Sequence, residues 1–265
     1  IDVMDALGSN IRVDARGAQV MRVLPRLNED INEEWISDKT RYAIDGLRRQ
    51  RLDKPYARGR DGRLHPVSWD EALKILATAL RTSKANAIGA IAGNQADAES
   101  LYALKSLMTR LGSPNLDCRQ DGAFLDPTLR TSYLFNSTIA GIDKADAFLL
   151  IGTNPRIEAP VLNARIRNRS LKGDFPIGFI GLLQDVSKDL TYDYKYLGNN
   201  IEALISLSDK KHPFFKLLKK AKKPMLIIGQ GALKGPDGGK TLGIACSIAN
   251  ECNMIDQKIN WNGFN

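Results

Sequence analysis

Continuous apolar runs of strand length recur along the chain and alternate with segments that repeat their apolar residues at helical spacing. A strand that is apolar on both faces is typical of a parallel sheet covered by helices on both sides. Crossovers between parallel strands are right-handed, which restricts the topology to a doubly wound arrangement. We therefore predict an α/β fold with a Rossmann-like, mostly parallel sheet. The runs are Ala87–Gly93, Ala147–Ile151, Ile177–Ile180 and Met225–Ile228.

The segments between these runs carry helix signals. Ser68 and Glu71 have the S-x-x-E spacing of a capping box, in which the serine side chain accepts a hydrogen bond from a backbone N–H of the first turn. Gly112 follows a second apolar stripe and is a typical helix stop. Further helices are predicted around residues 161–169, 214–220 and 241–250.

The first part of the chain has a different pattern of apolar and polar residues. Ile11–Asp14 and Val20–Leu24 form a predicted hairpin, and Pro25 ends its pairing. We predict a small β-containing and irregular region over residues 1–64 and an α/β domain over residues 65–265.

The composition limits the class of protein. No apolar run approaches the ~20 residues of a membrane span. The net charge is +8, but the basic residues are dispersed and lack the interleaved aromatic residues of a nucleic-acid reader. We expect solvated basic faces and contacts to acidic neighbours, with no nucleic acid and no direct membrane span. Because the chain begins at Ile1 and shows no targeting segment, we expect a processed or truncated product.

The cysteines and histidines do not form a metal-binding pattern. Cys118, Cys246 and Cys252 include no CxxC pair, whereas an iron–sulfur cluster usually takes four thiolates. His65 and His212 lie far apart in sequence. We predict no metal site. Cys118 is expected to be a small buried apolar residue, with a redox-sensing thiol or a metal ligand as the alternatives.

Glycine-containing loops follow the predicted strands, where ligands bind in sheets of this kind. None of them has the full GxGxxG spacing, so the simpler interpretation is that the glycines turn strands into helices. Asn154, Arg156 and Glu158 form the densest polar cluster, and we interpret it as helix capping. No catalytic, cofactor-binding or metal-ligating residue is predicted in this chain. The loops are Gly93-Asn94-Gln95, Gly152-Thr153-Asn154-Pro155, Gly181 and Gly229-Gln230-Gly231.

Residues 24–42 follow neither strand nor helix periodicity, and most of their polar side chains are of kinds that fix irregular backbone through hydrogen bonds. Trp35 stands in the middle, and we expect it, like Trp69 and Trp261, to be a core or interface anchor. The conformation of such an irregular segment depends on the structure around it. It resembles a segment of the large iron–sulfur subunit of respiratory complex I, the NADH:ubiquinone oxidoreductase.

The resemblance covers nearly the whole chain, and its motifs are spread from one end to the other. The matching residues are Gly8-Ser9-Asn10, Gly17, the run from Val20 to Tyr42, Asp45-Gly46-Leu47, Arg49-Gln50-Arg51-Leu52, Val67-Ser68-Trp69, Asp97-Ala98-Glu99, Thr138-Ile139-Ala140-Gly141, Gly152-Thr153-Asn154-Pro155-Arg156 with Glu158-Ala159, Asn163-Ala164-Arg165-Ile166-Arg167, His212-Pro213-Phe214 and Ala221-Lys222-Lys223-Pro224.

The resemblance implies a non-catalytic, scaffolding part of the peripheral arm of a proton-translocating NADH:ubiquinone oxidoreductase. The matching portion is similar to molybdopterin-oxidoreductase domains but belongs to a branch regarded as having lost that cofactor. Iron–sulfur clusters and FMN are then expected elsewhere in the complex. The implied partners are other peripheral-arm subunits and the cluster-bearing part of the same subunit. In the family, that part precedes the portion matched here, and the chain normally continues beyond Trp261-Asn262-Gly263.

The implied location is the matrix side of the mitochondrial inner membrane, or the cytoplasmic face of a bacterial inner membrane. The alternative function is a pterin-binding domain of a molybdenum or tungsten oxidoreductase.

Overall fold

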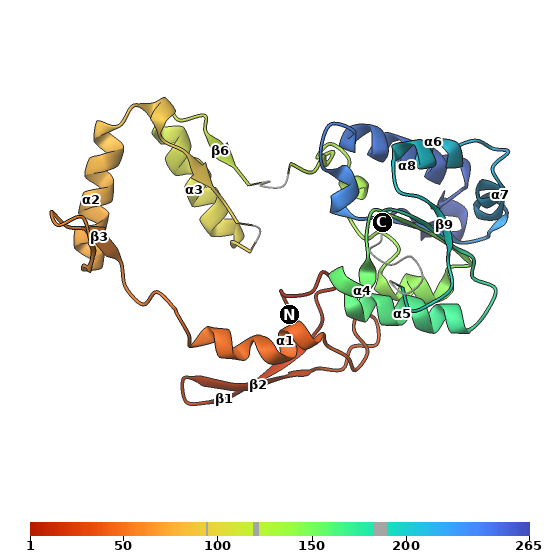
Figure 1. Ribbon diagram of the computed structural model, residues 1–265, viewed down its shortest axis with the longest axis horizontal. Coiled ribbons are helices and arrows are strands. Elements are labelled where there is room, and N and C mark those ends of the chain that lie inside the picture. Colours follow the sequence, from red (N-terminus) through yellow and green to blue (C-terminus); the bar gives the residue numbers. More distant parts are fainter. Residues whose placement is uncertain (94, 119–121, 183–189) are drawn as a thin grey trace. The chain divides into compact units, whose positions relative to one another are not determined.

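The computed structural model describes residues 1–93, 95–118, 122–182 and 190–265 (Figure 1). The chain forms two compact units, one of residues 1–44 with 121–265 and one of residues 45–120. Asn94 of the first predicted loop and Arg119-Gln120-Asp121, which follow Cys118, lie outside the described residues.

The larger unit is built on a four-stranded parallel sheet in the order β10-β7-β8-β9. The predicted α/β class is confirmed here, and three of the predicted apolar runs form β7, β8 and β10. The strands are β7 (Ala147–Ile151), β8 (Ile177–Ile180), β9 (Lys195–Gly198) and β10 (Pro224–Ile228).

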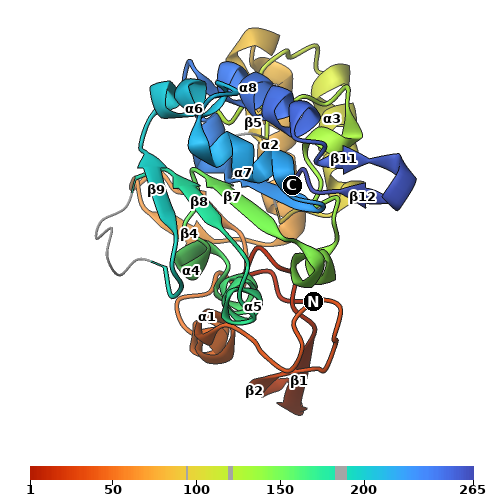
Figure 2. The same cartoon turned by 90° about the vertical axis from the view of Figure 1, so that its right-hand side faces the viewer.

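Helices cover both faces of this sheet (Figure 2). Successive residues of β7 point to opposite faces, so Leu149 joins one hydrophobic core and Phe148 the other. The first core is closed by α6, α7 and α8, and the second by α5. These helices are α5 (Pro160–Leu171), α6 (Ile201–Leu207), α7 (Pro213–Lys220) and α8 (Gly238–Glu251).

The strand order places a topological switch point beside β7. The chain runs outward from β7 through β8 to β9 and then returns to β10 on the other side of β7. The first predicted strand is not part of this sheet, because β5 (Ala90–Ile91) pairs with β6 (Leu116–Asp117) in the smaller unit. The Rossmann-like description of the whole domain therefore stays a prediction.

The N-terminal part of the larger unit contains the predicted hairpin. β1 (Ile11–Arg16) pairs antiparallel with β2 (Gln19–Pro25), which ends at the predicted proline. The irregular segment follows and leads into the short helix α1 (Asp38–Tyr42). Ser37 caps this helix by accepting a hydrogen bond from the backbone N–H of Thr40 at 3.4 Å.

The smaller unit holds two longer helices with the predicted end signals. Ser68 caps α2 (Trp69–Thr82) by accepting a hydrogen bond from the Glu71 N–H at 3.2 Å, so the predicted cap is confirmed. α3 (Ala98–Arg110) ends just before Gly112, whose φ is +68°. The unit also contains the antiparallel pair β3 (Tyr56–Arg58) and β4 (Leu64–Pro66).

The remaining elements are short. They are α4 (Pro155–Glu158), the antiparallel pair β11 (Ile255–Asp256) and β12 (Trp261–Asn262), and the 3-10 helices η1 (Ala43–Leu47), η2 (Ala85–Ala87), η3 (Arg130–Ser132), η4 (Ile139–Lys144), η5 (Gln230–Leu233) and η6 (Gln257–Ile259). In the parts of the chain described above, no helix has both the length and the apolar character needed to cross a membrane.

The three tryptophans occupy different environments. Trp261 is buried, and its indole Nε1–H donates to the Pro224 carbonyl at 2.9 Å, which confirms a core anchor. Trp35 and Trp69 are 53% and 68% exposed, so neither belongs to a core. For these two the interface interpretation stays a prediction.

Replacing Ser68 with alanine removes the cap of α2. We expect the free energy of unfolding of the smaller unit to fall by about 1 kcal/mol, because a backbone N–H of the first turn loses its partner. The denaturant midpoint measures this loss. Ser68→Asp keeps an acceptor at the same position and should retain most of the stability. Equal midpoints for Ser68→Ala and the parent chain would contradict the assignment.

Candidate functional site

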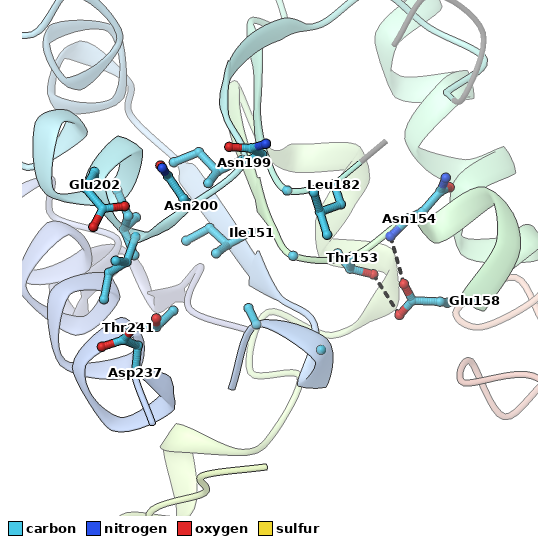
Figure 3. A pocket seen from close by; sticks show the side chains of 17 residues that line it. Ile151, Thr153, Asn154, Glu158, Leu182, Asn199, Asn200, Glu202, Asp237 and Thr241 are labelled. Atoms are coloured by element: carbon cyan, nitrogen blue, oxygen red, sulfur yellow. Dashed lines mark hydrogen bonds between the residues drawn. The ribbon is translucent and has the colours of Figure 1, made fainter. Parts of the chain in front are cut away.

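A cavity of about 560 Å³ opens at the carboxyl ends of β7, β8 and β10, beside the switch point (Figure 3). Its walls come from the loops after these strands and from the first residues of α6 and α8. Three predicted strand-end loops therefore meet here, through Gly152, Gly181 and Gly231. The fourth, at Gly93, belongs to the smaller unit.

The glycines of this cavity are used for packing between loops. Gly152 has a φ of +60°, and a Cβ added there would lie 3.0 Å from Cα of Ala232, with the Ala232 methyl closer still. A Cβ at Gly229 would lie 2.6 Å from the Gly152 carbonyl oxygen. The loop after β10 thus rests on the loop after β7. This packing explains the glycines without any bound ligand.

The predicted polar cluster forms a closed set of hydrogen bonds at one wall. Asn154 caps α4 and accepts from the backbone N–H of Arg156 at 3.1 Å. The Glu158 carboxylate accepts from the Asn154 backbone N–H at 2.8 Å and from the Thr153 hydroxyl at 3.1 Å (Figure 3). The capping interpretation is confirmed for Asn154, and the hydrogen bonds of Glu158 stabilise the same turn.

The walls of the cavity carry negative charge. Among its described lining residues the charged side chains are Glu158, Glu202 and Asp237. Glu202 and Asp237 lie across the cavity from Glu158 (Figure 3). Asn200 caps α6 by accepting from the Ala203 N–H at 3.1 Å, which occupies a donor of that helix end. Such walls disfavour an anion, which needs cations or free backbone N–H groups.

The cysteines do not gather at this cavity. Cys118 is exposed, so its expected burial is wrong: it follows β6, whose two residues are themselves exposed. Cys252 is buried, and burial raises the pKa of its thiol to about 11. Burial also raises the pKa of the Cys246 thiol, with the charge of Asp126 adding to it.

The histidines have local roles. His65 Nε2 lies 3.0 Å from the Asp61 carboxylate, and His212 Nδ1 accepts from the Phe214 N–H at 3.2 Å at the start of α7. Throughout the described ranges, no group of three or more His, Cys, Asp or Glu side chains is arranged to hold a metal ion.

Sequence reasoning assigned no role to Arg165, although the structure gives it a central one. Its side chain is 5% exposed on α5, and its guanidinium donates to the carbonyl oxygens of Glu29 and Asp30, the latter at 3.1 Å. The Glu33 carboxylate lies 3.4 Å away and the Asp143 carboxylate 3.8 Å away. The irregular segment is thereby fixed to α5 within the larger unit. No local signal marks this role, because the acceptors lie more than 100 residues away in sequence.

A second set of polar contacts joins the N-terminal residues to α1. The hydroxyl of Thr40 donates to Asp2 Oδ2 at 2.5 Å, and both residues are buried. Burial raises the pKa of the neighbouring Asp5 carboxyl, the Leu7 N–H that donates to Asp5 Oδ1 at 2.8 Å opposes this, and the charge of Asp2 adds to it. Lys39 Nζ also donates to the Ile157 carbonyl at 3.4 Å.

The contacts of Arg165 with residues 29–33 are called the Arg165 joint below, and the comparisons with known proteins place its two sides in different matched regions. Residues 51–265 match the family described as molybdopterin oxidoreductase. Residues 1–45 match the family described as NADH-ubiquinone oxidoreductase NDSU1/NuoG-like, 4Fe-4S domain.

Several curated relatives match along the whole chain, among them the following three. The mitochondrial NADH dehydrogenase [ubiquinone] iron-sulfur protein 1 of Solanum tuberosum is 46% identical, and the match covers 35% of its length. An NADH-quinone oxidoreductase subunit of Rickettsia bellii is 45% identical with 38% covered. The NADH-ubiquinone oxidoreductase 75 kDa subunit of Reclinomonas americana is 41% identical with 39% covered. The chain thus spans little more than a third of the length of these relatives.

Replacing Gly152 with alanine tests the packing of the two loops. We expect a loss of about 3 kcal/mol of unfolding free energy, because strain at positive φ adds to a clash with Ala232. Gly17→Ala is the matched control: its φ is +57° and nothing lies within 4 Å of an added Cβ, so only the ~1 kcal/mol of strain is expected. Chemical denaturation measures both. Ala232→Gly should restore part of the loss in Gly152→Ala, and equal losses at the two glycines would contradict loop packing.

Proposed function

The chain belongs to the molybdopterin oxidoreductase family, in the branch of the large iron–sulfur subunit of respiratory complex I, and we propose that it is a non-catalytic, structural portion of that complex's peripheral arm. In this role it supports electron transfer from NADH to ubiquinone by holding the cluster-bearing part of its subunit in place. The enzyme is the multisubunit translocase, and no catalytic residue is assigned to this chain.

The observation that carries the proposal is the Arg165 joint. The segment that Arg165 holds lies within the region matching the 4Fe-4S domain, whereas α5 lies within the molybdopterin-oxidoreductase match. A buried guanidinium that donates to the backbone of another region fixes that region rigidly on its own helix. Rigid placement is the property that an electron-transfer arm requires of its scaffold.

The cavity does not fit the cofactor that the family name implies. Molybdopterin carries phosphate, and the described walls present three carboxylates and loops that already pack on each other. We therefore propose that no pterin binds here. These observations weigh against the pterin-binding alternative.

The proposed position of the iron–sulfur clusters depends on which residues could ligate them. Residues 1–45 contain no cysteine and no histidine, so this stretch of the 4Fe-4S match offers no usual cluster ligand. We propose that iron–sulfur clusters and FMN lie elsewhere in the complex. The proposed partners are other peripheral-arm subunits and the cluster-bearing part of the same subunit.

The location is proposed from the names of the relatives, and the domain division from the sequence. Two of the relatives carry mitochondrial or ubiquinone names and another is a bacterial quinone oxidoreductase subunit. The proposed place is the matrix side of the mitochondrial inner membrane, or the cytoplasmic face of a bacterial one. The division into residues 1–64 and 65–265 remains our proposal for the two functional parts.

Arg165→Met should release the irregular segment while leaving the sheet intact. We expect the unfolding free energy to fall by about 2–3 kcal/mol, because two carbonyls and the Glu33 carboxylate lose a charged donor. Amide hydrogen exchange of residues 28–36 should become faster. Arg169→Met is the control, since Arg169 bonds the Ala145 and Gly173 carbonyls instead. Equally fast exchange of the segment in both variants would contradict the joint.

The proposed function is tested by purifying the native assembly gently and identifying its members by mass spectrometry. The chain should occur with subunits of the NADH-oxidising arm, and the isolated chain should retain neither molybdenum nor, after anaerobic reconstitution, iron with acid-labile sulfide. Stoichiometric molybdenum would favour the pterin-binding alternative. Stoichiometric iron and sulfide in the isolated chain would refute the cluster assignment.

A further inference from the structure

A lysine-rich surface lies on α7, on the side turned away from the sheet. Seven lysines occur between residues 210 and 223. Phe214 and Leu218 of α7 are buried in the first core, which leaves Lys216, Lys219 and Lys220 on the exposed face. We call the hollow beside this face the lysine groove.

The lysine groove lies between α7 and the carboxyl end of α8 and encloses about 770 Å³. Lys210, Lys216, Lys219 and Lys220 line it, together with Phe215, Asn250 and Glu251. Four cations thus converge on one hollow that is open to solvent.

Two of these lysines are already engaged. Lys210 pairs with the Glu251 carboxylate at 2.9 Å, and Lys219 donates to the Glu251 backbone carbonyl, where it satisfies the end of α8. Within the part of the chain that the structure describes, Lys216 and Lys220 have no acidic partner. The single carboxylate of Glu251 offsets only one of the four lysine charges, so three positive charges remain in the groove, two of them on Lys216 and Lys220.

Helix stability does not account for this concentration of charge. Lysines in the last turn, such as Lys219 and Lys220, are favoured by the helix dipole. Lys210 and Lys211 precede the first turn, where positive charge is unfavourable, and that turn contains no acidic residue. Lys216 and Lys220 stand four residues apart on the helix and repel each other.

We propose that the lysine groove docks an acidic polypeptide segment of a neighbouring protein. Glutamate or aspartate side chains would pair with Lys216 and Lys220, and the exposed Asn250 amide offers donors and acceptors to a peptide backbone. A single-stranded nucleic acid fits less well. Phe215, the aromatic residue among the described lining, is 4% exposed and gives bases no platform for stacking.

The first test measures binding of a fluorescent oligoglutamate peptide to the full chain by anisotropy, a measurement that does not depend on the proposed electron-transfer role. Lys216→Glu with Lys220→Glu should weaken binding by roughly tenfold or more. Lys240→Glu with Lys258→Glu makes the same charge change on exposed lysines elsewhere and should leave binding within about twofold of the parent chain. If the glutamate pair lowers the melting temperature, Lys216→Gln with Lys220→Gln replaces it.

Three results would overturn the proposal. One is equal binding by the parent chain and the groove variant, and another is an equal loss in the groove and control variants. The third is tighter binding of an oligothymidylate with the same sensitivity to the groove variant, which would make this a nucleic-acid surface.

The second test uses carbodiimide coupling in the native assembly, which joins lysines directly to carboxylates. Lys216 or Lys220 should be linked to an aspartate or glutamate of another chain. Links from these lysines only to Glu251 of their own chain would also overturn the proposal.

Discussion

The larger unit is organised by the requirement that β7 be buried on both faces. All five of its residues are at most 2% exposed, and parallel partners pair with both of its edges. Leu149 and Phe148 belong to different cores, so helices must cover both sides of the sheet. The switch point, the cavity and the turn into α4 and α5 all follow from where this strand ends. Arg165 takes its position from α5, so the joint to the irregular segment depends on β7 as well.

Local signals in the sequence predicted local structure well. The caps at Ser68 and Asn154 and the hairpin stop at Pro25 each depend on a few neighbouring residues, and the structure confirms them. Apolar continuity identified β7, β8 and β10 because those strands are covered on both faces. It missed β9, whose residues Lys195–Gly198 are exposed or half-buried at the sheet edge and have no apolar run to find.

Long-range partners were beyond the reach of the same reasoning. The sequence placed the glycine loops at one edge of a sheet, but the contact of Gly152 with Ala232 depends on the tertiary register of two loops. Arg165 binds mainly to backbone carbonyls, which every residue possesses and which therefore leave no mark in a sequence. The exposure of Cys118 was misjudged for a related reason, because composition gives a residue type's usual burial and not its neighbours.

The cavity shows how the protein's own groups can stabilise the edge of a sheet at a switch point. A parallel sheet leaves a crevice where its strand order reverses, and that crevice can hold a ligand or solvent or be lined by groups that the protein itself satisfies. Here the Glu158 carboxylate is satisfied by Thr153 and Asn154, and the loop after β10 fills the approach over Gly152. Adding one cation to these walls would not create an anion site, because Glu202 and Asp237 would still repel the charge. These interactions also stabilise the edge of the sheet that leads to Arg165.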